Sequence, residues 1–238
     1  MANFETAYKN YILPNEGGYA NAPADKGGET YAGIARNFNK DWEGWTLIDF
    51  EKKKLKGVAI KNNTKFPAIQ YAVEKFYLAR WNTTNIGKID NQEVANLLYD
   101  FQVHSGANAI KGIQRVLKIS DDGKLGADTL ANINKANPMK LHNALLEERK
   151  YFLEKLIAQN PSQEAFRAGW MARLEKFRGV YEAAKELVTA AKEKTVQVVT
   201  ENKGTIGIGL GIGAALLLLY LTTRGDKKPK EADLKTTT

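Results

Sequence analysis

The sequence predicts a mainly α-helical fold with a hydrophobic helix close to its C-terminal end. Apolar residues recur at intervals of three and four along most of the chain, which is the spacing of one helix face, whereas the alternation typical of strands is scarce. The exception is a glycine-rich stretch, residues 15–35, which predicts a tight loop or a short hairpin.

Several helices are expected before the C-terminal region. Residues 68–82, for example, have helical spacing, and the apolar face of this helix consists of Ile69, Val73, Phe76 and Tyr77. The Asn-Pro pair at 160–161 should stop the last of these helices, because the residue before a proline avoids helical geometry. The expected helices span 68–82, 90–105 and 139–158, and a turn with a short helix spans 121–134.

The C-terminal region is expected to reach a membrane. Residues 163–201 have the spacing of one long amphipathic helix, and we interpret residues 181–203 as a helical stalk. Residues 204–223 are uncharged, and a helix of that length spans roughly 30 Å, the thickness of a bilayer core. We therefore predict a transmembrane helix here, followed by a polar tail at 224–238.

Four glycines lie at alternate positions of this hydrophobic segment. Small residues spaced in this way let two helices approach closely, so the span is predicted either to self-associate or to be a glycine-rich monomer. The glycines are Gly207, Gly209, Gly211 and Gly213. At the other end, residues 1–18 do not resemble a secretory signal, because charged side chains interrupt the apolar ones.

The composition excludes several classes of protein and site. With 43% hydrophobic and 26% charged residues, the 238-residue chain is neither wholly disordered nor collagen-like. The absence of cysteine excludes disulfides and thiolate zinc sites, and two histidines disfavour a multi-histidine metal site, so we expect no metal or cofactor. The net charge of +8 indicates an anionic partner, which could be nucleic acid, a membrane surface or an acidic wall polymer.

Three carboxylates lie among the glycines of residues 15–35. Glu16 follows an apolar helix-like segment and precedes two glycines, and Asp25 and Glu29 come later in the stretch. Cleavage of a glycoside needs one carboxyl group that donates a proton and a second group that activates water or stabilises positive charge. Acids beside glycines also serve turns and helix caps, so this pattern alone leaves both interpretations open.

The same stretch resembles the signature of glycoside hydrolase family 108, peptidoglycan-cleaving muramidases of phages, prophages and bacterial secretion loci. The first block of the resemblance consists of Glu16, Gly17, Gly18, Tyr19, Pro23, Ala24, Asp25, Gly27, Gly28, Glu29, Thr30, Gly33 and Ile34. Later matches, in chain order, are Trp81, Asp100, Val103, Gly106, Gln114, Leu117, Asp122, Gly123, Gly126, Thr129, Leu130, Gly169, Trp170 and Arg173. The later matches include the segment often labelled peptidoglycan-binding.

The resemblance implies a lysozyme-like α-helical fold with a small loop or hairpin region. It also implies hydrolysis of the β-1,4 bond between N-acetylmuramic acid and N-acetylglucosamine, with Glu16 as the general acid. A looser likeness to phage-type lysozymes implies that Asp25 and Thr30 position the attacking water. Glu29 is the alternative second acid, and the choice between retention and inversion stays open.

Residues expected to bind substrate are Tyr19, Glu29 and Trp42. Aromatic side chains can stack on sugars, and the polar sequence around Trp42 and Trp45 leaves a groove position open for them, with core packing as the alternative. Core packing is the preferred interpretation for Trp81 and Trp170.

The implied organisation has four parts. They are a muramidase domain at 1–180 with a peptidoglycan-binding-like segment at about 106–178, the stalk, the transmembrane helix and the tail. The expected protein is a membrane-anchored phage or prophage lysin that acts when the host is lysed or entered. Its predicted location is the host inner membrane or the membrane of a lipid-containing virion, with peptidoglycan and lipid, not nucleic acid, as partners. The alternatives are a non-enzymatic peptidoglycan-binding tether and a muramidase that assists secretion.

Overall fold

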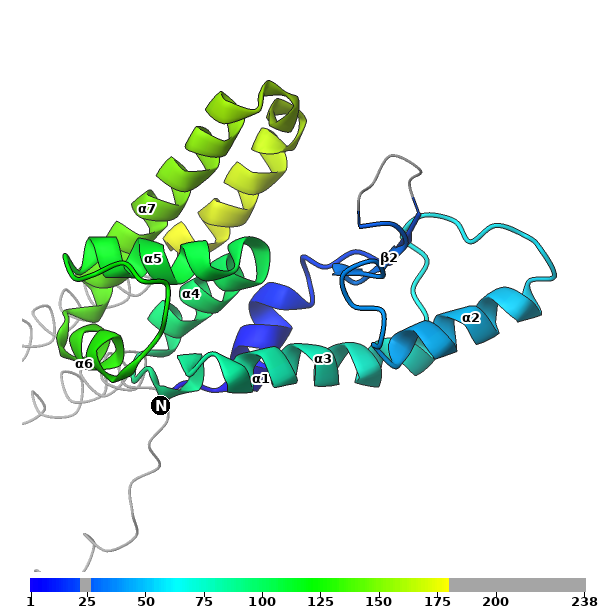
Figure 1. The fold of residues 1–238 in the computed structure, drawn as a ribbon, viewed down its shortest axis with the longest axis horizontal. Coiled ribbons are helices and arrows are strands. Elements are labelled where there is room, and N and C mark those ends of the chain that lie inside the picture. The colour runs from blue at the N-terminus through cyan, green and yellow to red at the C-terminus, as the bar shows by residue number, and fades with distance from the viewer. Residues whose placement is uncertain (22–26, 180–238) are drawn as a thin grey trace, which may run out of the picture. The chain divides into compact units, whose positions relative to one another are not determined.

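The computed structural model describes residues 1–21 and 27–179, and its described part is mainly α-helical (Figure 1). The chain divides into two compact units. The first unit is Phe4–Gly87, and the second combines Met1–Asn3 with the chain from Lys88 onward. The prediction of a mainly α-helical fold is confirmed.

The first unit holds short helices around a small antiparallel sheet. Its elements are α1 (Phe4–Ala7), the π-helical turn η1 (Tyr8–Ile12), β1 (Tyr19–Ala20), β2 (Thr30–Tyr31), β3 (Ile34–Ala35), α2 (Gly44–Lys54), the 3-10 turn η2 (Pro67–Ile69) and α3 (Gln70–Thr83). A further 3-10 turn, η3 (Ile86–Lys88), crosses the boundary between the units. The strands lie in the order β1-β2-β3, and each pairs antiparallel with the next.

Aromatic side chains make up much of the core of this unit. Tyr8 and Tyr77 are almost completely buried, and their rings lie 5.9 Å apart. Trp81 packs edge-on against Phe4 at 5.9 Å, which confirms the core interpretation of Trp81. These contacts join α1 and η1 to α3, so the segment before Glu16 rests on a long helix.

The turn between β2 and β3 consists of Ala32 and Gly33, which both have positive φ angles, of 47° and 74°. A two-residue hairpin turn of this kind matches the twist of the strands but requires φ above zero at both positions. Glycine adopts that geometry freely, whereas alanine does so under strain. The Tyr77 hydroxyl donates a hydrogen bond to the Ala32 carbonyl at 2.8 Å and so holds the turn in place.

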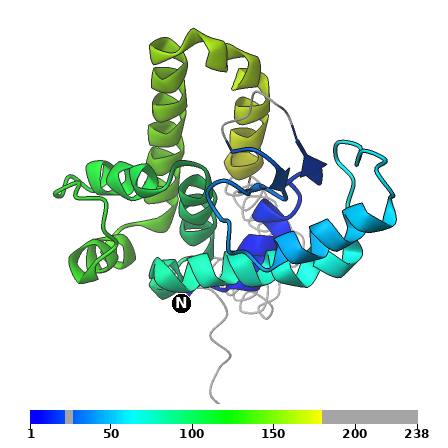
Figure 2. The same ribbon diagram turned by 45° about the vertical axis from the view of Figure 1, so that its right-hand side comes forward.

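The second unit is a group of helices around α4. Its elements are α4 (Gln92–Ser105), α5 (Ala107–Val116), α6 (Ala127–Lys135), α7 (Pro138–Gln159) and the 3-10 turn η4 (Pro161–Phe166), followed by helical residues 167–179. After η4 the chain turns back, so residues 167–179 lie beside α7 (Figures 1 and 2). Leu97, Tyr99 and Phe101 of α4 are completely buried, which places α4 at the centre of this unit's core.

Asparagine and glycine set the ends of these helices. The Asn91 side chain accepts a hydrogen bond from the Val94 amide at 3.0 Å at the start of α4, and Asn137 caps α7 in the same way. Gly106, with a φ angle of 56°, ends α4 and opens α5. The predicted stop at Asn160 is confirmed, because α7 ends at Gln159.

The predicted long helix over 163–201 differs at its start. Residues 161–166 form η4 because Pro161 follows the Asn160 cap, and the α-helix begins only at residue 167. The stalk, the transmembrane helix and the tail, with the four spaced glycines, lie outside the described residues. Within residues 1–21 and 27–179, no helix combines the length and the apolar character needed to cross a membrane. This finding contradicts the expectation of a single-pass membrane protein, and we withdraw that expectation.

Candidate functional site

Glu16 lies where the N-terminal helical segment gives way to the sheet. Helical structure ends at Ile12, and the amides of Asn15 and Glu16 both donate to the Ile12 carbonyl at 3.0 Å. Pro14 cannot donate such a bond, and it stands in the turn that follows. The chain therefore bends just before Glu16, and the Glu16 side chain is half-buried.

The carboxyl group of Glu16 lies directly against Gly33. A Cβ atom on Gly33 would clash with Oε2 of Glu16 and would stand 2.9 Å from the Tyr77 hydroxyl oxygen. Glycine thus provides the space in which a carboxyl and a phenol meet above the β2–β3 turn. Since Tyr77 also binds the Ala32 carbonyl, one buried side chain borders the acid and anchors the turn beneath it.

A second tyrosine responds electrostatically to the acid. Burial raises the pKa of Tyr8 to about 12, and the negative charges of Glu74 and Glu16 add to this shift. The Tyr8 hydroxyl accepts a hydrogen bond from Gln70 Nε2 at 2.8 Å. Glu16 is therefore a half-buried carboxyl whose charge acts on the neutral Tyr8 phenol, a setting in which Glu16 can donate or accept a proton at a fixed place.

Of the two further candidate catalytic residues, the structure describes Thr30 but not Asp25. Thr30 lies in β2, and its hydroxyl donates to the Gly28 carbonyl at 3.2 Å, so it supports its own turn. Thr30 belongs to the same hairpin as Gly33, against which Glu16 packs. Asp25 lies outside the described residues.

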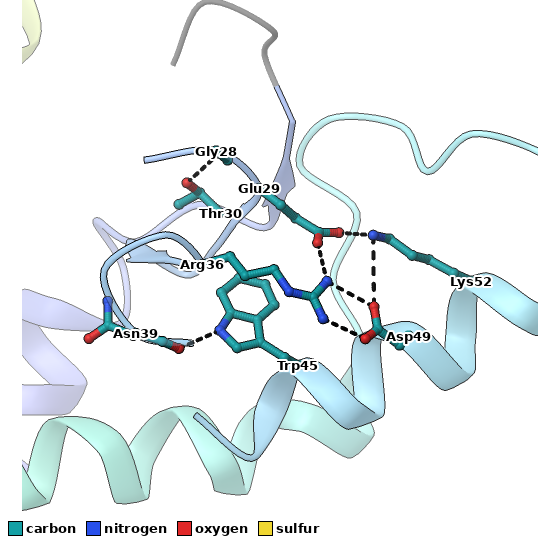
Figure 3. A network of polar contacts seen from close by, with 8 residues as sticks. All are labelled: Gly28, Glu29, Thr30, Arg36, Asn39, Trp45, Asp49 and Lys52. Atoms are coloured by element: carbon teal, nitrogen blue, oxygen red, sulfur yellow. Dashed lines mark hydrogen bonds and ion pairs between the residues drawn. The ribbon is translucent and has the colours of Figure 1, made fainter. Parts of the chain in front are cut away.

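Glu29 forms a network of ion pairs with Arg36, which directly follows β3, and with residues of α2 (Figure 3). Its side chain is 8% exposed and pairs with Lys52 and, at 2.5 Å, with Arg36. Arg36 in turn binds both oxygens of Asp49, at 2.9 and 2.5 Å. The cations of Arg36 and Lys52 thus pair with the carboxylates of Glu29 and Asp49, and these pairs link the hairpin region to α2.

The network keeps Glu29 ionised. Burial on its own raises the pKa of Glu29, but hydrogen bonds from Lys52, Tyr19 and Arg36 outweigh it and hold the pKa below its ordinary value. A carboxylate of this kind is a poor proton donor near neutral pH. The geometry therefore suits Glu29 to fastening β2 to α2 rather than to acid catalysis.

The aromatic candidates for sugar stacking are core residues in this structure. Trp42 is 8% exposed, packs edge-on against Trp45 at 5.1 Å and donates from Nε1 to the Ala72 carbonyl at 3.2 Å. Its ring folds over Gly44, where a side chain would clash with it. Tyr19 is also buried, with its hydroxyl bound to Glu29 and Lys52 5.6 Å above its ring. Both rings are buried in this structure, and the assignment of Tyr19 and Trp42 to substrate binding stays a prediction.

Sequence reasoning missed the residues that surround Glu16 and the helix α2. Tyr77 was grouped only with the apolar face of its helix, although its hydroxyl borders the acid. Ala32-Gly33 is the local signal that could have placed a tight turn there. Within the described part of the chain, no group of three or more acidic, histidine or cysteine side chains could hold a metal ion.

Comparison with known proteins finds matches to two family models. Residues 9–106 match the family model described as Glycosyl hydrolase 108, and residues 108–175 match the model described as Predicted Peptidoglycan domain. Residues 9–106 are therefore a glycosyl hydrolase 108 domain. It is a glycoside hydrolase, and Glu16, Gly33 and Tyr77 all lie within the family 108 match.

Together the two matches support hydrolysis of peptidoglycan in general, with peptidoglycan as a partner of this protein. A solved structure of SagA from Brucella abortus is similar, with 26% sequence identity and a TM-score of 0.54. That similarity covers 76% of this chain and 94% of SagA. No curated protein matches the chain.

Proposed function

We propose that this chain hydrolyses the β-1,4 bond between N-acetylmuramic acid and N-acetylglucosamine, with Glu16 as the general acid. The observation that carries the proposal is the half-buried Glu16 carboxyl, held against Gly33 and beside Tyr77 within the family 108 match. Binding to the wall does not need a carboxyl at that place, which favours an enzyme over a non-enzymatic tether.

In the proposed reaction Glu16 protonates the glycosidic oxygen while the bond from that oxygen to the sugar C1 breaks. The oxygen of a water molecule bonds to C1 and the water loses a proton. That proton passes to a base nearby and finally restores the protonated form of Glu16. Tyr77 and the Ala32-Gly33 turn are proposed to hold the Glu16 carboxyl in one orientation. Such positioning lowers the entropy lost on reaching the transition state.

The second catalytic group is proposed to come from the same hairpin region. Asp25 and Thr30 are the candidates for positioning the water, as the resemblance to lysozymes implies. Thr30 already lies on the strand next to the Gly33 turn. Glu29 is the weaker alternative, because its charge is already shared by Arg36 and Lys52.

The proposed cellular role is cleavage of the bacterial wall by a phage or prophage lysin, when the host is lysed or entered. This role rests on the resemblance of the first sequence block to muramidases of phages and prophages. A muramidase that opens the wall for secretion would use the same chemistry, so the experiment below addresses the shared reaction.

The test compares three full-length proteins on purified peptidoglycan. We expect the wild type to release reducing sugar ends, Glu16→Gln to release none above background, and Glu5→Gln to match the wild type. Glu5 is a matched control because it precedes Glu16 in the same N-terminal segment and pairs with Lys9 on the surface. Circular dichroism should show the same helix content in all three proteins.

Mass spectrometry of the products completes the test. Hydrolysis adds one water across the cleaved bond and leaves a reducing muramic acid end, whereas products without that added mass would contradict the proposed reaction. Full activity of Glu16→Gln would overturn the assignment of the acid. Binding of the wild type to peptidoglycan without any cleavage would favour the tether.

A further inference from the structure

Residues 55–66 form a loop that returns from the end of α2 to the small sheet (Figure 1). The amide of Tyr19 donates a hydrogen bond to the Thr64 carbonyl, and the amide of Asn63 donates to the Tyr19 carbonyl, both at 2.8 Å. Because β1 lies at the edge of the sheet, these two bonds attach the loop to its open side. The loop is therefore fixed to the chain just after Glu16.

Two glycines allow the loop to approach the chain this closely. A Cβ atom on Gly18 would clash with the backbone of Asn63 and Thr64. A Cβ atom on Gly17 would stand 3.4 Å from Oδ1 of Asn63, so the Asn63 carboxamide lies against Gly17. The residue that follows Glu16 in the sequence thus has this carboxamide as its neighbour in space.

A tight turn holds the backbone at Asn63. The amide and the hydroxyl of Thr64 both donate to the Lys61 carbonyl, at 3.2 and 2.7 Å, and so close a turn over residues 61–64. The φ angle of Asn63 is 64°, in the left-handed region that asparagine enters more readily than most residues. The Asn63 side chain therefore extends from a backbone whose position is already set.

The carboxamide of Asn63 is free to bind a ligand. Asn63 is exposed, and within residues 1–21 and 27–179 its carboxamide forms no hydrogen bond with another residue. A carboxamide has two N–H donors and a carbonyl acceptor, so it can exchange one hydrogen bond in each direction with another amide. A carboxylate or a phosphate would use its donors alone. Because the backbone is fixed in advance, less entropy is lost when such bonds form.

The substrate of the proposed reaction carries amides of the matching kind. Both sugars at the bond that Glu16 is proposed to cleave bear an N-acetyl group, whose N–H donates and whose carbonyl accepts. We propose that Asn63 binds the N-acetyl group of a sugar next to the cleaved bond. Asn63 is then a substrate-binding residue that places the bond at Glu16. The inference rests on the proposed function, because that function supplies the N-acetylated sugar.

Binding of peptide-free peptidoglycan glycan strands to the full-length Glu16→Gln protein tests this role without hydrolysis. Adding Asn63→Gly should weaken binding about tenfold, since two hydrogen bonds to the sugar are lost. Glycine adopts a φ angle of 64° without strain, so this substitution removes the carboxamide and keeps the backbone. Titration calorimetry measures both affinities.

Asn62→Gly in the same Glu16→Gln protein is the matched control. It removes an exposed carboxamide from the neighbouring position of the same loop, and it should leave the affinity unchanged. Any effect of a new glycine on the loop as a whole should appear in this control as well. The difference between the two variants therefore reports the carboxamide of Asn63.

Glycan strands that have been fully N-deacetylated identify the group that Asn63 binds. These strands keep the sugar rings but lack the acetyl groups, so the Glu16→Gln proteins with and without Asn63→Gly should bind them alike. The charge that deacetylation adds acts on both proteins equally and cancels in the comparison. In NMR spectra of Glu16→Gln, the side-chain amide signals of Asn63 should shift when acetylated strands are added.

Three results would overturn the proposal. They are an unchanged affinity of Asn63→Gly for acetylated strands, an equal loss of affinity on both kinds of strand, and the absence of binding by Glu16→Gln. An equal loss in Asn62→Gly would do the same. Release of reducing ends by the wild type is scored separately. A protein that binds acetylated strands through Asn63 but releases no reducing ends would contradict the proposed hydrolysis and not the role of Asn63.

Discussion

The position of Glu16 depends on neighbouring residues that are small or conformationally fixed. Pro14 bends the chain before it, Gly33 leaves room for its carboxyl, and Tyr77 holds the turn below. The glycine-rich pattern made Glu16 a candidate, and the resemblance to family 108 made it the predicted acid. Tyr77 could not, because a tyrosine at helical spacing is indistinguishable from a core residue until the turn packs against it.

Replacing Gly33 by alanine should test how far the turn positions Glu16, once the effect of backbone strain on stability is measured separately. The new Cβ would clash with Oε2 of Glu16, so the carboxyl must move, and we expect hydrolysis to fall about 100-fold. The φ angle of 74° adds a loss of unfolding free energy of about 1 to 2 kcal/mol. Release of reducing ends and urea unfolding measure the two effects.

Gly57→Ala is the matched control for that experiment. Gly57 also has a positive φ angle, of 92°, but a Cβ there meets no atom within 4 Å. It should show a similar loss of unfolding free energy and keep its activity. If both variants lost activity equally, Gly33 would not be a positioning residue for Glu16.

At the scale of elements, the sequence predicted helices better than it predicted what joins them. The apolar spacing found α3, α4 and α7 within a few residues of their observed ends, because each presents one face to a core. It missed α2, where Trp45 and a run of lysines gave no clear face. It also missed the ion pairs that fasten α2 to the hairpin, since Glu29 is far from Asp49 and Lys52 in the sequence.

The Glu29 network makes α2 and the hairpin dependent on one carboxylate. Glu29→Gln leaves Arg36 and Lys52 facing a neutral amide, and we expect the free energy of unfolding to fall by about 1 to 3 kcal/mol. The loss is below that of a fully buried pair because Arg36 is 31% exposed. Urea unfolding should show this loss, while the hydrolysis rate of the folded fraction stays within a few fold of the wild type. A complete loss of hydrolysis without a loss of stability would instead make Glu29 the second catalytic acid.

The buried histidine of α7 predicts how the second unit responds to acid. His142 has no exposed surface, and burial lowers its pKa to about 4 from an ordinary 6.5. The unfolded chain therefore binds the proton more readily than the folded chain between these values, so stability is lost as the pH falls through 6.5 towards 4. From pH 7 to pH 5 this group alone should cost about 2 kcal/mol of unfolding free energy.

Urea unfolding of the wild type and of His142→Gln at pH 7 and pH 5 measures that contribution. Glutamine does not titrate, so the variant should lose about 2 kcal/mol less than the wild type over this range. The comparison cancels the titration of the remaining groups, which both proteins share. An equal loss in the two proteins would show that His142 is not the group responsible.

For the molecule as a whole, the two units hold different features. The first unit holds the acid proposed for the sugar bond, and the second contains residues 108–175, which match the Predicted Peptidoglycan domain. The DDGKLG segment could be predicted as a turn, but its purpose could not. Gln114 of α5 accepts from the Gly123 amide at 2.9 Å and donates to Asp122 at 2.7 Å, so this turn is built around a buried amide rather than a metal.

The net charge of +8 acts on the protein as a whole and predicts how salt affects it. Attraction between exposed charges is screened over about 10 Å at 0.1 M salt and about 3 Å at 1 M salt. Binding of the inactive Glu16→Gln protein to purified sacculi should therefore weaken about tenfold between 0.05 and 0.5 M salt. Cleavage of a short uncharged chitin oligosaccharide by the wild type, if that substrate is accepted, should change by less than twofold, because no long-range attraction assists it. Sedimentation of sacculi measures the first quantity, and salt-independent sedimentation would show that the positive charge has no part in finding the wall.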